Sequence, residues 1–279
     1  MAQGLTVRRP RARGGRIVPT IVLVVCGLFF LLPILAVVRF SFQNLRTFQL
    51  RWSNIFDRWS LDGLRTAFKE KEFLPTLYLS LRLALGTVLV TIALLLPTAL
   101  LVHIKLPRAR SFVEFCTLLP YMIPPIALVA GVAAFFRPNA KWFLNSDYSL
   151  IPFYVVLALP FTYRSIDAGI RAIDVRTLID ASRSLGAGWL TTMFRVLIPN
   201  LRMAIIGASF LTATVVLGEF TIAQTLLKRT FPQFLAEFYT NEGQAGSALS
   251  VLTLLGTVAL LGILTVLTRK RGQKAASLY

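Results

Sequence analysis

Six long apolar runs divide this chain, and a soluble fold of 279 residues could not bury them all. Hydrophobic residues make up 56% of the chain and its mean hydropathy is +0.68, well above that of soluble domains. A helix needs about 20 apolar residues to cross a bilayer. The sequence therefore predicts an all-α, polytopic membrane protein with six transmembrane helices, at residues 17–38, 76–102, 115–136, 150–163, 203–227 and 247–268.

The first run could also be a signal peptide, because basic residues 8–16 precede it. It is too long for a signal sequence and no small-residue cleavage site follows it, so we interpret it as a retained anchor. The fourth run is short and could be extended by residues 164–168. We predict three parts: a tail, first helix and loop at 1–72, a five-helix core at 73–270, and a tail at 271–279.

The charges predict the orientation of the helices. The chain carries a formal charge of +18, and its basic residues flank the apolar runs, which indicates topology signals and lipid contacts rather than nucleic-acid binding. The side that holds both termini has 18 Lys and Arg, against 12 on the other side. By the positive-inside rule, both termini and the 164–202 loop face the cytoplasm of a bacterial inner membrane.

The 164–202 loop has a helix–turn–helix pattern. Apolar residues at 170, 173, 178, 181 and 185 share one helical face, and Asp174 is placed to cap that helix. Gly186 permits a turn, and a second apolar stripe begins at Trp189. From the residues alone, an amphipathic pair lying on the membrane and a docking surface for a partner are equally good interpretations.

A family pattern resolves this choice. The residues that carry it are Asp180, Ala181 and Ser182, then Gly186, and then Val196, Ile198 and Pro199. Their spacing resembles the EAA loop of permease subunits from binding-protein-dependent ABC importers: Glu-Ala-Ala, three residues, Gly, nine residues, Ile-x-Leu-Pro. Four positions depart from that pattern, and the shorter Asp180 is the departure that bears on ion pairing. Segments 119–125 and 217–221 also resemble this family.

The resemblance implies the type I (MetI-like) importer permease fold, with a coupling helix that docks on a cytoplasmic ATPase. It also implies two ATPase copies, an extracytoplasmic solute-binding protein and a second permease, which we expect to be a different chain. In the loop, Ala181 and Ser182 would permit close approach, Leu185 would fill a socket, and Asp180 and Arg183 would form ion pairs. The expected coupling residues are Asp180, Ala181, Ser182, Arg183, Leu185, Gly186, Val196, Ile198 and Pro199.

The chain lacks the motifs of a nucleotide-binding or hydrolytic enzyme. It contains no G-x-x-x-x-G-K-[ST], G-x-S-x-G or H-E-x-x-H sequence. His103 is its one histidine, and Cys26 and Cys116 have no metal-ligand spacing. We therefore expect no enzyme activity, metal or cofactor in this chain, with ATP and Mg²⁺ on the partner ATPase.

Glu219 is the one acidic residue placed well inside an apolar run. A charge at that depth is costly unless it faces protein or water, so it is a candidate for the translocation path. A structural carboxylate bonded to another helix is the alternative, and we weigh it slightly higher. Residues 121 and 122 lie between prolines in a broken helix, and such breaks can line cavities. The path candidates are Glu219, Thr212, Thr221, Gln224, Tyr121 and Met122.

The predicted function is a permease subunit of an ATP-driven importer. Within the family, the segments at 217–221 and 245–250 resemble the group that transports polyamines, ferric iron, thiamine, sulfate and phosphonate. The acidic Glu219 favours polyamines such as spermidine and putrescine, or another small organic cation. A gradient-driven secondary transporter is less favoured, because the chain shows neither inverted repeats nor several acids inside its apolar runs.

Overall fold

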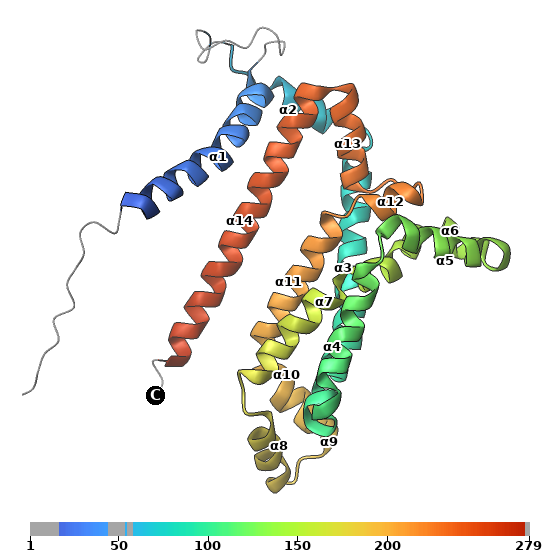
Figure 1. The fold of residues 1–279 in the computed structure, drawn as a ribbon, viewed down its shortest axis with the longest axis vertical. Coiled ribbons are helices and arrows are strands. Elements are labelled where there is room, and N and C mark those ends of the chain that lie inside the picture. The colour runs from blue at the N-terminus through green and yellow to red at the C-terminus, as the bar shows by residue number, and fades with distance from the viewer. Residues whose placement is uncertain (1–16, 44–53, 55–57, 277–279) are drawn as a thin grey trace, which may run out of the picture.

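The computed structural model describes residues 17–43, 54 and 58–276, and these residues are almost entirely helical (Figure 1). Their one β-type contact is an isolated bridge between Gln43 and Trp59. The longer helices are α1 (Ile17–Phe42), α2 (Asp62–Lys69), α3 (Phe73–Lys105), α4 (Arg110–Leu118), α5 (Pro125–Asn139), α7 (Leu150–Arg171), α8 (Val175–Ser184), α11 (Arg202–Leu217), α13 (Phe231–Asn241) and α14 (Gly243–Ala276).

Short helical segments connect these helices. They are η4 (Pro107–Ala109), η5 (Leu119–Met122), α6 (Lys141–Asn145), η6 (Asp147–Ser149), α9 (Trp189–Thr191), the π-helical η7 (Thr192–Leu197), α10 (Ile198–Asn200) and α12 (Thr221–Thr225). The fold is therefore a set of long helices joined by short helical segments, which agrees with the all-α fold that the sequence predicts.

Helices α3, α7 and α11 pack together and form the core of the bundle (Figure 1). Leu100, Tyr163 and Leu201 are buried near the end that holds α8, and Leu83, Tyr154 and Val216 are buried near the middle. The approach of α7 to α11 is very close, since a Cβ on Gly169 would lie 2.1 Å from that of Ala204. Small residues at helix contacts are typical of membrane bundles.

A cluster of phenylalanines closes the other end of the bundle, which we call the α13 end. Phe73 of α3 meets Phe231 edge to face, and Phe234 stacks on Phe238 at 5.4 Å. Helices α13 and α14 turn back tightly against each other, because Gly246 lies against the backbone of Tyr239. This cluster anchors the beginning of α14, which then runs beside, but apart from, the core and ends before the level of α8 (Figure 1).

The described residues contain three single helices that are long and apolar enough to cross a membrane, and two bent helix pairs raise the number to five. A further apolar helix covers Gly243–Ala259, at the beginning of α14. These elements lie at the six predicted positions, although the fourth and fifth predicted helices differ from the structure in length.

The fourth predicted helix is longer than its apolar run. Helix α7 continues from Leu150 to Arg171, eight residues beyond the predicted end at 163. Its 22 residues span about 33 Å, which is close to the thickness of the hydrocarbon core. The structure agrees with the extension of this run through residues 164–168 and carries it on to Arg171. The helix continues there because the charged residues that end the apolar run are compensated within the bundle, as described below.

The fifth predicted helix is shorter than predicted. Helix α11 ends at Leu217 and α12 begins only at Thr221, so 203–227 is not one continuous helix. The third predicted helix is broken as expected, with an 88° bend between its α4–η5 and α5 halves. Pro120, Pro124 and Pro125 lie at this bend, where proline removes backbone donors and restricts the preceding residue.

Candidate functional site: an exposed loop and a polar cavity

The loop between α7 and α11 folds as the predicted helix–turn–helix. The Asp174 carboxylate accepts hydrogen bonds from the backbone N–H and the hydroxyl of Thr177, which caps α8. These two bonds lower the pKa of Asp174 below its ordinary value, the side-chain bond more than the backbone bond. The cap fixes where α8 begins, and therefore which of its faces is presented to solvent.

Gly186 supplies the turn after α8. Its φ of +79° lies in the left-handed region that glycine adopts readily. The N–H of Gly186 donates to the carbonyl of Arg183, and the N–H of Ala187 donates to the carbonyl of Ser182. A Cβ built on Gly186 has no neighbour within 4 Å, so its surroundings within this chain are open.

Ser182 does not lie on the exposed face of the loop, where we expected a docking residue. Its hydroxyl is 2.7 Å from the Thr192 hydroxyl, and both side chains are buried. The two residues hold α8 against η7. Ser182 therefore closes the helix pair from within, which leaves its neighbours Ala181 and Arg183 on the outer surface.

The outer surface of the loop combines charged, small and large apolar side chains. Asp180, Ala181, Arg183, Leu185 and Gly186 are all exposed. The Leu185 side chain is 88% exposed. Leu190 and Phe194 of the second helix are exposed as well. An apolar side chain this accessible beside a left-handed glycine is typical of a contact surface for another protein.

The later motif residues face inward more than outward. Val196 is partly buried, and Ile198 packs against the core cluster near Leu201. Pro199 is exposed in α10, just before α11 begins. These three residues therefore join the loop to the bundle rather than extend its outer surface.

A buried carboxylate links three helices just above this loop. Asp167 of α7, 4% exposed at its side chain, accepts two hydrogen bonds from Arg110 of α4, at 3.0 and 2.9 Å. It also contacts Arg171 at 2.6 Å and His103 of α3 at 3.4 Å. Sequence reasoning missed this network: Asp167 was counted as a loop charge, and His103 was dismissed for want of a second metal ligand. The spacing of Asp167 and Arg171 at i, i+4 was a usable signal.

A cavity of about 490 Å³ lies where α11 gives way to α12. It brings Tyr121, from the α4–α5 bend, together with Glu219 and Thr221, which lie about 100 residues further along the chain; all three are predicted path residues. Phe161 of α7 meets Tyr121 edge to face at 5.5 Å, and Phe220 also lines the cavity. The result is a mostly apolar wall that contains three aromatic rings and one carboxylate.

Glu219 has a structural role in this cavity. One carboxylate oxygen accepts a hydrogen bond from the N–H of Ile222 at 2.8 Å, and the other accepts a longer bond from Ala223 at 3.4 Å. A carboxylate at a helix N-terminus satisfies free N–H groups and favours the helix dipole. This cap explains why the fifth apolar run breaks at 218–220.

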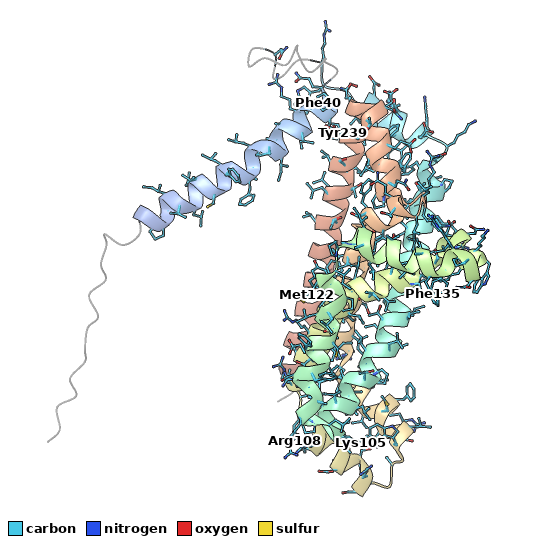
Figure 2. All side chains as sticks on the ribbon, turned by 45° about the vertical axis from the view of Figure 1, so that its right-hand side comes forward. Phe40, Lys105, Arg108, Met122, Phe135 and Tyr239 are labelled. Atoms are coloured by element: carbon cyan, nitrogen blue, oxygen red, sulfur yellow. The ribbon has the colours of Figure 1, made fainter. Side chains whose placement is uncertain are left out.

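The other predicted path residues do not line this cavity. Thr212 is fully buried in the α7–α11 contact, where its hydroxyl lies 2.6 Å from that of Thr162. Met122 is 74% exposed at the α4–α5 bend (Figure 2), and Gln224 is exposed on α12. Within this chain, Thr212 therefore serves the contact between α7 and α11, and its place in a solute path stays a prediction. Within the described part of the chain, no group of three or more His, Cys, Asp or Glu residues could hold a metal ion.

A bundle of membrane-crossing helices, with an exposed loop and a mostly apolar cavity that holds one carboxylate, is typical of a membrane transport subunit. Residues 96–273 match the family model described as the binding-protein-dependent transport system inner membrane component. Because this match covers more than half of the chain, the chain belongs to that family, whose members are the membrane subunits of ABC transporters and not their ATPases.

Individual relatives agree with this assignment. The chain is 26% identical over 215 residues to an ABC transporter permease protein of Streptomyces antibioticus, a match that covers 76% of this chain and 93% of the relative. It is 31% identical over 101 residues to the methionine import system permease protein MetP of Bacillus subtilis, covering 36% and 45%. Its fold resembles a chain of a bacterial ABC transporter involved in the import of the acidic polysaccharide alginate. That chain has a TM-score of 0.66 and 16% identity, with 92% and 99% covered.

Proposed function

We propose that the α7–α11 loop is the coupling element of an importer in which this chain is one of two permease subunits. The observation that carries the proposal is the exposed group of Ala181, Leu185 and Gly186 beside the charged Asp180 and Arg183. A small, apolar and left-handed segment can enter a groove on a partner, and the two charges can orient it.

In this arrangement the α8 end of the bundle faces the cytoplasm, together with both termini. Two copies of a cytoplasmic ATPase hold ATP and Mg²⁺, and this chain binds neither. A second permease, a different chain, completes the solute path. A solute-binding protein delivers the solute to the α13 end. The side that holds both termini and the 164–202 loop has more basic residues than the other side, and this excess supports the orientation.

The proposed function is tested by purification from native membranes. A tagged full-length chain is expected to co-purify with an ATPase and a second permease, and the complex is expected to hydrolyse ATP in lipid vesicles faster when the solute-binding protein is added. Transport driven by an ion gradient, with no nucleotide-hydrolysing subunit in the purified complex, would contradict the proposal.

For the solute, we propose a small organic cation such as a polyamine. The support is the cavity, in which the aromatic rings of Tyr121, Phe161 and Phe220 accompany the carboxylate of Glu219. Aromatic faces and carboxylates both attract ammonium groups, whereas a sulfate or phosphonate would be repelled by Glu219. Ferric iron and thiamine are the alternative cationic solutes of this group.

Glu219→Gln is expected to lower solute uptake at least about tenfold, because it removes the charge that faces the cavity. Gln keeps one oxygen that can accept the Ile222 N–H, so assembly of the complex is expected to persist. Uptake by vesicles and recovery of the intact complex are measured together. Glu242→Gln, which removes an exposed carboxylate near the α13 end, is the matched control. Equal uptake by Glu219→Gln and the unaltered protein would exclude Glu219 from solute recognition.

A further inference from the structure

Helices α5 and α6 form an arm that leaves the bundle sideways (Figure 1). The 88° bend after η5 directs α5 away from the direction of α4. The arm continues through η6 directly into α7. Because α7 alone has about the length of one bilayer, its first residue, Leu150, marks a membrane boundary. The arm therefore lies at that boundary, on the α13 side.

The side chains of the arm suit a membrane interface. The side chain of Phe135 is 66% exposed on the arm (Figure 2), and that of Trp142 in α6 is 75% exposed. Tyr148 of η6, just before α7, is half-exposed, and its hydroxyl accepts a hydrogen bond from Arg82 of α3 at 3.4 Å. Aromatic and basic residues collect at the boundary between hydrocarbon and water, as they do here.

A cavity of about 330 Å³ lies between this arm and the end of α12. Two basic residues of the arm, Arg137 and Lys141, line it together with Asn145 and Thr225. No described residue forms an ion pair with Arg137 or Lys141.

The nearest acid on the connection to α7 does not neutralise this cavity. Asp147 lies 3.4 Å from the Nζ of Lys228, which is buried and also donates a hydrogen bond to the Asn145 carbonyl at 2.7 Å. The Asp147 charge is thus compensated by Lys228. The two basic side chains of the arm remain as an uncompensated positive pair beside Asn145, whose side-chain amide is a hydrogen-bond donor.

We propose that this cavity binds the phosphate of an anionic phospholipid headgroup. The positive pair supplies the charge complement, and the exposed aromatic side chains place the same arm at headgroup depth. The acyl chains would extend from the interface over the apolar surface of the arm. A lipid held here would fix the arm beside α12, the helix whose N-terminus is capped by Glu219 at the other cavity.

The test uses the purified complex after its lipids have been removed in detergent. Native mass spectrometry measures binding of phosphatidylglycerol, which is anionic, and of phosphatidylcholine, which has no net charge. The Arg137→Gln/Lys141→Gln variant is expected to bind phosphatidylglycerol about 30-fold more weakly, since each basic residue near a lipid surface contributes about fivefold. Arg137→Lys/Lys141→Arg keeps both charges and is expected to retain binding.

The matched control removes two charges from the opposite membrane boundary, at Lys105 and Arg108 (Figure 2). Lys105→Gln/Arg108→Gln is expected to leave the strongest phosphatidylglycerol site intact. Equal loss in both double variants would overturn the proposal. So would displacement of the lipid by inorganic phosphate at equal concentration, which would indicate a free-anion site. Efficient crosslinking of Trp142→Cys to the second permease in native membranes would show that a protein covers the arm, and would also overturn it.

Discussion

Gly186→Asp is expected to reduce solute uptake about 100-fold or more while the chain still assembles in the membrane. Gly186 adopts a φ of +79° at the exposed turn, and nothing in its own chain lies within 4 Å of an added Cβ. The substitution therefore leaves internal packing intact. It introduces an unpaired charge into the surface proposed to enter the ATPase groove, and burying such a charge costs about 2–5 kcal/mol.

The effect of charge can be separated from the effect of backbone strain. Gly186→Ala adds only the Cβ in the left-handed region, a cost of about 1–2 kcal/mol, and is expected to keep most of the uptake. Ala181→Asp places a charge on the neighbouring exposed turn and is expected to behave like Gly186→Asp. ATP hydrolysis and uptake are measured on the same vesicles. Coupled uptake at the normal rate in both Asp variants would refute docking through this loop.

The local chemistry of the loop was predictable from its sequence. Asp174 caps α8 and Gly186 forms the turn because both roles depend on neighbours within three or four residues. The burial of Ser182 was not predictable. It depends on Thr192, which the turn brings back against α8 from the second helix of the pair. Periodicity predicts that Ala181 and Leu185 share one face of α8. It could not show which face of α8 is buried against the second helix.

Hydropathy located the helices but not where they end. The run at 150–163 stops at Arg164, although α7 continues to Arg171, because hydropathy counts Asp167 as a charge and cannot count its partners on α3 and α4. In the run at 203–227 the apolar residues continue past the end of α11. There a single carboxylate, Glu219, caps the start of a new helix. Hydropathy averaged over many residues does not detect the effect of one side chain.

The path candidates show the same limit. Tyr121, Glu219 and Thr221 meet at one cavity because the α4–α5 bend and the α11–α12 break lie close together. The residues around one break give no indication that the other break lies next to it. Thr212 looked equally suitable as a polar residue in an apolar helix, yet it serves the contact between α7 and α11. Which helix a polar side chain faces depends on packing between distant segments, and one sequence does not contain that information.

Asp167→Ala is expected to lower the free energy of unfolding by about 3 kcal/mol, because it leaves the surrounding basic side chains without their shared carboxylate. Arg110, Arg171 and His103 come from three helices, so the loss is also expected to loosen α4 from α7. Thermal unfolding of the purified complex in detergent measures the first effect. Crosslinking between cysteines introduced into α4 and α7 measures the second.

The same pair of helices supplies a control. Glu114 of α4 contacts Arg164 of α7 at 3.3 Å, but these side chains are 37% and 62% exposed. Because solvent screens exposed ion pairs, Glu114→Ala is expected to cost about 0.5 kcal/mol. A double change, Asp167→Ala with Arg110→Ala, is expected to be less damaging than the sum of the two single changes, since neither charge is then left alone. If Asp167→Ala were as mild as Glu114→Ala, burial would not strengthen the Asp167 network, and the extension of α7 through its charged residues would need another cause.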